Sequence, residues 1–209
     1  ALTAHCGDAR AKPPCPRPFL SATASMRFNQ CFPNTLFSTV STQPTVTVSV
    51  ACFDREVWIH VEGRGNFQGS APLKKFVQAM ILRGYREFVI DLAACDHMDS
   101  TFMGTLTGIS QNLRELGQGS LRTLNVSPRN VELFENLGLD MLFGVEPVGE
   151  VAVSPAEQGA KLLQLPMEAG PERDVVLSAH EALIAANPTN AERFRDVLAY
   201  LKSGEPSDS

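Results

Sequence analysis

The sequence predicts an α/β fold in which a mixed sheet of four to five strands is covered by helices. Two segments, 45–50 and 57–62, alternate apolar and polar residues as half-buried strands do. After them, stretches with the apolar spacing of helices alternate with short apolar stretches of strand length. The resulting order, β-β-α-β-α-β-α, favours a mixed sheet with helices packed on it.

Local signals place the elements of the first half. Residues 54–56 form a predicted turn between the two strands, and the glycine-rich residues 63–69 form a predicted loop after the second strand. A helix is predicted over 71–83, because apolar side chains recur on one face there. Gly84 then follows as a C-terminal stop.

The second half begins with a short segment that carries the main chemical signal. An apolar run over 88–92 predicts a buried strand, and a loop follows over 93–98. Asp99 is a good N-cap for a helix whose first turn contains Ser100 and Thr101. The apolar face of this helix is formed by Met103, Leu106, Ile109, Leu113 and Leu116.

Two hydroxyl groups at a helix N-terminus are well placed to carry a phosphate. Backbone N–H groups and the helix dipole favour added negative charge at this position. A simpler interpretation is that Asp-Ser-Thr before an apolar helix serves only as a cap. The residues alone leave both interpretations open.

A further strand is predicted over 120–126, followed by another helix. Ser127 is the expected N-cap, Pro128 occupies the first helical position, and Gly138 ends the helix. The apolar side chains of this helix are Val131, Leu133, Phe134 and Leu137. This helix completes the predicted sheet-and-helix pattern before residue 147.

Several of these segments resemble the STAS domain, the family of anti-sigma factor antagonists. Residues 99–106, Asp-Ser-Thr-Phe-Met-Gly-Thr-Leu, are similar to the family's Asp-Ser-Ser/Thr-Gly-Leu-Gly-x-Leu segment. The Gly-rich loop resembles the family's Gly-x-Leu-Asp, and the helix after Ser127 resembles the family's helix before its last strand. The resemblance covers 45–147 and implies a STAS-like fold. In this chain Phe102 replaces the family's usual Gly, and Asn66 replaces its usual Asp.

The resemblance also implies a partner-switching function. The implied phosphorylation site is Thr101, with Ser100 as the fallback, and the unphosphorylated domain would bind an anti-sigma factor or serine kinase and release a sigma factor. A phosphatase is a further expected partner. The protein would not be an enzyme and would need no cofactor or metal, since the kinase carries ATP and Mg²⁺. The implied docking face contains Asn66, Phe67, Asp96, His97, Asp99 and Phe102.

Composition narrows the remaining classes of function. The 209 residues are 44% apolar and 20% charged, with a net charge of −5, as in soluble globular proteins. No apolar run approaches the roughly 20 residues needed to span a bilayer, which argues against a membrane partner. The sequence has no cluster of basic residues interleaved with aromatic ones, so we do not expect nucleic acid as a partner. The five cysteines are scattered and lack a C-x-x-C pair, so we expect core thiols in a cytoplasmic protein.

The pattern divides the chain into five predicted regions. Residues 1–44, rich in Pro, Ser and Thr, form a disordered N-terminal extension, and 45–147 form the STAS-like domain. Residues 148–170 form a linker, 171–203 a C-terminal helical hairpin, and 204–209 a disordered tail. The second helix of the hairpin carries an apolar stripe of Phe194, Val197, Leu198 and Leu201. This stripe predicts equally that the hairpin packs on its own domain or that it serves as a homodimerisation or partner-docking element.

Two alternatives belong to other classes of protein. One is a non-phosphorylated STAS scaffold or sensor subunit of a multi-protein signalling assembly, which Phe102 in place of Gly favours. The other is a small enzyme or nucleotide-binding protein that uses the 63–69 loop, although its glycine spacing misses the dinucleotide-binding pattern. A metal site at 95–99 is disfavoured because no second ligand pair lies at useful spacing.

Overall fold

The computed structural model describes residues 46–53, 55–117, 119–147, 162–167 and 169–203. The predicted N-terminal extension, the C-terminal tail and most of the predicted linker lie outside these residues. Everything below concerns the described part of the chain.

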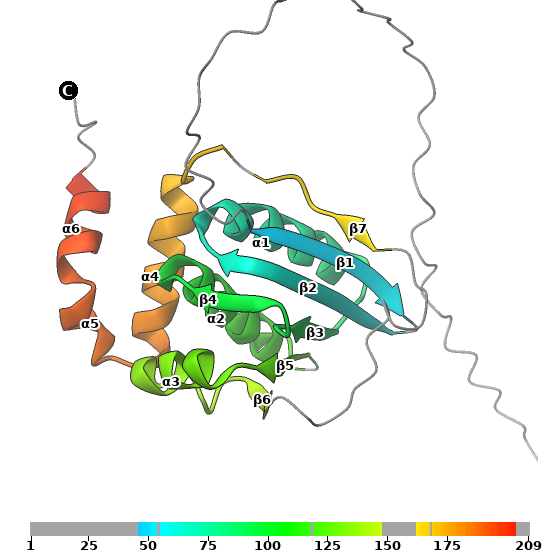
Figure 1. Cartoon of the computed structure of the whole chain (residues 1–209). Helices are drawn as coiled ribbons and strands as arrows, with labels where there is room; N and C mark the ends of the chain where they lie inside the picture. The colour runs from blue at the N-terminus through cyan, green and yellow to red at the C-terminus, as the bar shows by residue number, and fades with distance from the viewer. Residues whose placement is uncertain (1–45, 54, 118, 148–161, 168, 204–209) are drawn as a thin grey trace, which may run out of the picture. The chain divides into compact units, whose positions relative to one another are not determined.

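A mixed sheet forms the centre of the fold, as the sequence predicts (Figure 1). Six strands follow the order β6-β5-β3-β2-β1-β7. They are β1 (Thr47–Phe53), β2 (Glu56–Gly65), β3 (Glu87–Asp91), β5 (Ser120–Val126), β6 (Gly144–Pro147) and β7 (Leu163–Gln164). Strand β1 runs antiparallel to β2 and β7, whereas β2, β3, β5 and β6 pair in parallel. The mixed α/β class is therefore confirmed.

The described sheet is larger than the four to five strands expected. Strand β4 (Cys95–Met98) falls in the segment predicted as a loop and pairs in parallel with the end of β2. Strand β7 adds two residues to the free edge of β1. Both strands are too short to give a periodic signal of their own, and partner strands far along the chain define them.

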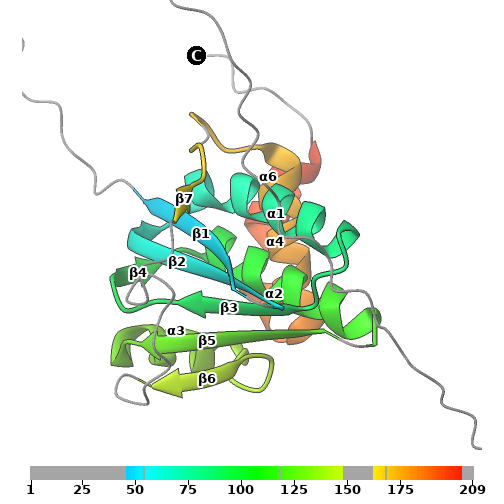
Figure 2. The same cartoon turned by 90° about the vertical axis from the view of Figure 1, so that its right-hand side faces the viewer.

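Six helices accompany the sheet in the described residues. They are α1 (Phe67–Leu82), α2 (Ser100–Glu115), α3 (Pro128–Leu137), α4 (Arg173–Ala186), α5 (Asn190–Arg193) and α6 (Arg195–Ser203). Figure 2 shows α1, α2 and α4 together on one side of the strands. The main core lies between this layer and the sheet, and its largest fully buried side chains include Phe88, Phe102, Phe134 and Ile59. Among the described helices, none is long and apolar enough to cross a membrane.

Helix α1 begins four residues earlier than the predicted start at residue 71. The side-chain oxygen of Asn66 accepts a hydrogen bond from the backbone N–H of Gln68, which caps the helix there. The segment 63–69 therefore contains the end of β2 and the first turn of α1 rather than a loop. The prediction placed a loop at 63–69 because this segment is rich in glycine. Pro72 also lies inside the observed helix, although proline usually marks a helix start.

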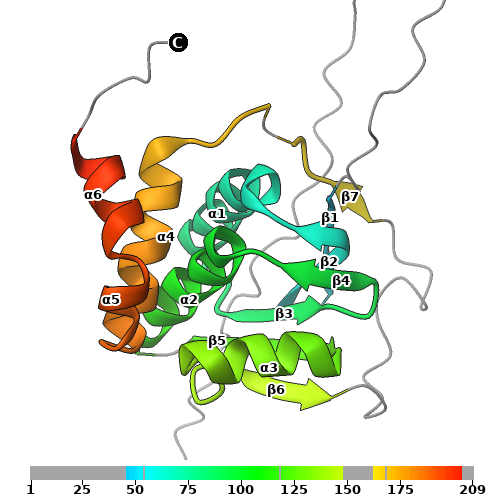
Figure 3. The same cartoon turned by 60° about the vertical axis from the view of Figure 1, so that its left-hand side comes forward.

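Three helix N-termini lie along one edge of the sheet (Figures 1 and 3). Helix α1 follows the end of β2, α2 follows β4, and α3 follows β5. Strands β2, β3, β4 and β5 all run in the same direction, so their carboxyl ends meet at this edge. In open α/β sheets this is the edge where functional groups gather.

The C-terminal segment lies beside α2 rather than apart from the sheet domain. Helix α4 packs against α2, and α5 and α6 follow on the outer side of α4 (Figure 3). The predicted second helix of the hairpin is divided at Phe194 into α5 and α6. Only Phe194 in the predicted apolar stripe is buried, whereas Val197 is exposed and Leu198 and Leu201 are half-buried.

Candidate phosphorylation and docking site

One carboxylate connects the N-termini of two helices. Asp99 Oδ1 accepts a hydrogen bond of 2.8 Å from the backbone N–H of Phe102, which caps α2. Its Oδ2 accepts a second bond of 3.2 Å from the backbone N–H of Phe67, in the first turn of α1. The Asp99 N–H in turn donates to the carbonyl of Gly65 at the end of β2. The sequence predicted the α2 cap but had no means to show the link to α1.

The Asp99 residue is half-buried between these helices. Burial raises the pKa of Asp99, although backbone N–H donors from Phe102, Phe67 and Thr101 and the charge of Arg64 act against it. Donors from two helix ends thus compensate for part of the desolvation of the carboxylate. The hydrogen bonds of Asp99 to Phe102, Phe67 and Gly65 fix where α2 begins relative to α1.

The two candidate acceptor hydroxyls are covered rather than open. Thr101 is only 8% exposed, and Ser100 is half-buried. The Ser100 Oγ lies 3.1 Å from Nε2 of His180, which belongs to α4 and is itself buried. His180 is 80 residues away in sequence, so no local pattern pointed to it.

The second nitrogen of His180 defines the direction of this hydrogen bond. Its Nδ1 lies 2.8 Å from the carbonyl oxygen of Val176, and a carbonyl can only accept. In a neutral imidazole the proton is therefore on Nδ1, and Nε2 accepts from the Ser100 hydroxyl. In that tautomer the hydroxyl proton of Ser100 points at α4.

Phe102 lies in the core and does not contribute to the predicted docking face. Its side chain is 0% exposed. A Cβ placed on Gly65 would lie 2.9 Å from the Phe102 ring, and one on Gly69 would lie 3.4 Å from it. The aromatic ring thus occupies the space that these two glycines leave open at the base of α1 and α2. Contact between Phe102 and a partner in this arrangement is excluded by its burial.

The other predicted docking residues lie along the same edge of the sheet. Asn66 and Phe67 begin α1, Asp96 is exposed on β4, and His97 is half-buried beside it. Burial lowers the pKa of His97, and the charges of Arg129 and Arg64 lower it further. These two arginines were not predicted as site residues. They place positive charge beside the acidic groups of the edge.

Cys95 offers little as a nucleophile. The thiol is buried, and this burial raises its pKa. Backbone hydrogen bonds with Gly65 and His97 lower the pKa, but by less than burial raises it. A raised pKa reduces the thiolate fraction, which is the reactive form. In the described part of the chain, no group of three His, Cys, Asp or Glu residues is arranged to hold a metal ion.

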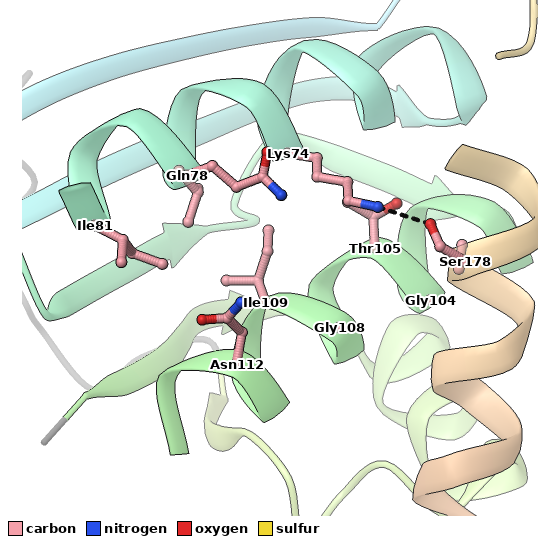
Figure 4. A pocket seen from close by; sticks show the side chains of 11 residues that line it. Lys74, Gln78, Ile81, Gly104, Thr105, Gly108, Ile109, Asn112 and Ser178 are labelled. Atoms are coloured by element: carbon pink, nitrogen blue, oxygen red, sulfur yellow. Dashed lines mark hydrogen bonds between the residues drawn. The ribbon is translucent and has the colours of Figure 1, made fainter. Parts of the chain in front are cut away.

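A partly open groove of about 310 Å³ lies next to the start of α2, between α1, α2 and α4 (Figure 4). Lys74 crosses one end of it, where its Nζ donates a 2.7 Å hydrogen bond to Ser178 Oγ of α4. Gly104 and Gly108 form part of the α2 wall, and Ile81 and Ile109 supply apolar surface. From α4 only Ser178 and Ala179 line the groove, so most of its wall is formed by α1 and α2.

The comparison with protein families identifies the sheet domain. The family model for the STAS domain matches residues 41–152, which is more than half of the chain. The chain therefore belongs to the STAS domain family. The matched residues include β1 to β6 and α1 to α3, and they end before α4. No curated protein matches the chain significantly.

Solved structures similar to this chain include several antagonists of anti-sigma factors. One from Mycobacterium paratuberculosis is 21% identical, with a TM-score of 0.46, and covers 53% of this chain and 93% of that chain. The anti-sigma factor antagonist SpoIIAA in its unphosphorylated form is 18% identical, with a TM-score of 0.42, over 53% and 93% of the two chains. The phosphorylated form of SpoIIAA from Bacillus is 20% identical, with a TM-score of 0.42, over 49% and 94%.

Proposed function

We propose that this protein is a partner-switching regulator of transcription that binds an anti-sigma factor with serine kinase activity. Phosphorylation at the start of α2 would end that binding. The observation that carries the proposal is the placement of Ser100 and Thr101 in the first turn of α2, beside the edge formed by Asn66, Phe67, Asp96, His97 and Asp99. Membership of the STAS family supports it.

The chemistry requires only a hydroxyl from this protein. The hydroxyl oxygen forms a bond to the γ-phosphorus of ATP, the bond to the ADP oxygen breaks, and the hydroxyl proton passes to a base of the kinase. ADP leaves, and the kinase supplies ATP and Mg²⁺, so this protein is not the enzyme. The product carries about two added negative charges.

The added charge would act on binding rather than on folding. A phosphate in the first turn of a helix is favoured by the dipole, by roughly 0.3–1 kcal/mol at an exposed position. The same phosphate would stand near Asp96 and Asp99 on the docking edge, where it changes the charge that a partner meets. A partner that fits the unmodified edge would therefore dissociate.

The direct test is phosphopeptide mass spectrometry after co-expression with the anti-sigma serine kinase that the proposal requires as partner. We expect modification of the parent and its loss in Thr101→Ala. Persistence in Thr101→Ala together with loss in Ser100→Ala would move the site to Ser100, whose hydroxyl is less buried. Binding of the kinase, measured by titration calorimetry, should be retained in both alanine variants.

A second candidate is a STAS scaffold or sensor subunit that is never phosphorylated. The burial of Thr101 and the complete burial of Phe102 favour it, because a kinase cannot reach a covered hydroxyl. In that case neither alanine variant would differ from the parent in mass, and the protein would still assemble with its partners. A modified peptide spanning residues 99–106 would exclude this candidate.

A further inference from the structure

We propose that the groove between α1, α2 and α4 is a binding site for a small amphipathic monocarboxylate, such as a medium-chain fatty acid. The carboxylate lies at Lys74, and the hydrocarbon chain lies along the groove between α1 and α2. The inference does not rest on the proposed function, because no residue of the proposed docking edge lines this groove. It gives the domain a small-molecule ligand in addition to the protein partner proposed above.

The environment of Lys74 in α1 points to a negatively charged ligand. Its side chain is half-buried at one end of the groove, where its Nζ bonds to the hydroxyl of Ser178 (Figure 4). Among the described residues no carboxylate forms an ion pair with Lys74, whereas the neighbouring Lys75 pairs with Glu172 at 2.6 Å. A half-buried ammonium that has only a neutral partner is incompletely compensated, so an anion in the groove would be stabilised there.

The hydrogen-bond donors of the groove fit a carboxylate better than a phosphate. An ammonium group has three protons, and Lys74 uses one of them on Ser178, so two remain for the two carboxylate oxygens. The hydroxyl of Thr105 adds no donor, because it bonds to the carbonyl of Thr101. The hydroxyl of Ser178 adds none either, because it bonds to the carbonyl of Val175. The α2 wall lies past the first turn of the helix, where backbone N–H groups already have partners, so one charge and two donors match a monoanion.

Beyond the ammonium group, the groove offers apolar surface for a hydrocarbon chain. Val77 and Ile109 are buried in its lining, and Ile81 lies further along α1 (Figure 4). From Thr105 to Asn112 the α2 wall rises by about 10 Å. A staggered chain with carbon–carbon bonds of about 1.5 Å covers this length with about eight carbons. The groove therefore fits a chain of medium length.

The two ends and the size of the groove favour a small molecule over a peptide. The hydrogen bond between Lys74 and Ser178 crosses one end. Gln78 and Asn112 are exposed towards the other end, and neither side-chain amide has a hydrogen-bond partner among the described residues. A volume of about 310 Å³ lies at the small end of the range for small-molecule sites, and a peptide helix about 10 Å in diameter would not fit.

The test is a titration of the full ¹⁵N-labelled chain with sodium octanoate, followed by two-dimensional NMR. We expect saturable shifts of the backbone amides of Gly104 and Gly108 and of the side-chain amides of Gln78 and Asn112, which all line the groove. Butyrate should bind at least about tenfold more weakly, because it buries fewer CH₂ groups. No saturable shift up to about 20 mM octanoate, or shifts confined to residues outside the groove, would overturn the proposal.

Two adjacent lysines of α1 provide a matched pair of variants. Lys74→Gln removes the charge at the groove and should weaken octanoate binding by about tenfold or more, since hydrogen bonds to charged groups are the stronger ones. Lys75→Gln removes the same charge at an exposed position one residue further on and should change binding by less than about twofold. Thermal melting checks that both variants fold. Unchanged binding in Lys74→Gln, or equal weakening by the two variants, would overturn the proposal.

A neutral probe with the same hydrocarbon chain separates recognition of the carboxylate from simple apolar binding. 1-Octanol should bind the parent at least about threefold more weakly than octanoate, because it cannot compensate the charge of Lys74. Lys74→Gln should lose this preference for octanoate, and Lys75→Gln should keep it. If the parent binds 1-octanol as tightly as octanoate, the groove does not select a carboxylate and the proposal fails.

Discussion

Helices α4 and α6 come from the same C-terminal segment and show similar apolar periodicity, yet they are buried to very different degrees. Helix α4 buries Val175, Ala179, His180, Ala182 and Leu183. In α6, which lies wholly within the described residues, no residue is buried, and Val197 and Tyr200 are 40% and 61% exposed. Similar patterns in the sequence therefore led to different packing.

The difference arises from the surface that each helix meets. Helix α4 lies on α2, where Gly104 and Gly108 allow close approach of the two backbones. Helix α6 packs against α4, mainly through groups at the helix surface, including the Lys202–Glu181 ion pair and the bond of 2.7 Å from Arg173 Nε to the Leu201 carbonyl. Apolar periodicity indicates that a face can be buried, but the receiving surface decides how completely.

The largest expected effect comes from the leucine that α4 buries completely. Leu183→Ala should lower the free energy that holds α4 in place by about 2–5 kcal/mol, because it leaves a cavity that cannot collapse fully. Leu198→Ala in α6 is the matched comparison, and we expect a loss below about 1 kcal/mol for this half-buried side chain. Amide hydrogen exchange of residues 173–186 and 195–203 measures both. Similar losses in the two helices would remove the contrast between them.

The next largest effect is expected at Asn190, which begins α5 in the connection between α4 and α6. The side chain of Asn190 is buried and donates to the carbonyls of Leu137 and Leu183. Asn190→Ala leaves both acceptors without this donor and should cost about 1–3 kcal/mol. Thr189→Ala, at an exposed neighbouring position, should change the melting temperature little. If the two variants melt alike, the junction does not anchor α4.

Local signals in the sequence predicted the elements whose ends are fixed by their own residues. Asp99 caps α2 and Ser127 caps α3, as expected, and Gly138 ends α3 in a left-handed conformation with φ of 67°. These features depend on hydrogen bonds that span only a few residues. For the same reason the break between α4 and α5 at residues 187–188 was predictable.

Features that depend on distant residues were not predictable in the same way. Strand β4 exists because the end of β2 pairs with it, and Phe102 is buried because Gly65 and Gly69 leave space for its ring. The contact between Ser100 and His180 joins residues 80 positions apart. Without the chain's other half, the acceptor segment resembles an exposed turn, and the sequence placed Thr101 on an accessible face, whereas its side chain is only 8% exposed.

The third prediction tests whether the exposed face of α6 has a partner of its own. A homodimer through the hairpin is one of the two outcomes that the sequence predicts equally, and Leu198 lies within the stripe. Leu198→Glu should lower the stability of the monomer by at most about 1 kcal/mol, because the position is only half-buried. If α6 forms a dimer, light scattering should show half the mass of the parent. Tyr200→Glu tests the more exposed part of the same helix, and unchanged mass in both variants would rule out a dimer through α6.

The smallest effect is expected at the ion pair that joins α6 to α4. Lys202 Nζ lies 3.0 Å from Glu181 Oε1, and the two side chains are 57% and 50% exposed. An exposed pair of this kind contributes roughly 0.2–1 kcal/mol, because water screens the charges and both side chains lose freedom. Lys202→Ala should therefore raise hydrogen exchange in α6 slightly at low salt, and the difference should vanish near 1 M salt, where the Debye length is about 3 Å. Exchange in α4 should not change, because its hold on α2 does not depend on this pair.

The charge-reversed double variant, Glu181→Lys with Lys202→Glu, isolates the pairwise term. It keeps both charges and their separation, so exchange in α6 should return to the parent rate, whereas each single reversal should raise it. The Arg195–Asp196 pair, which lies within α6 alone, is the control, and its loss should leave the attachment of α6 to α4 intact. If Lys202→Ala instead loosens α4 as much as α6, the two helices move as one unit. Helix α6 would then form one unit with α4 on α2, and the contrast between the two helices would concern burial only.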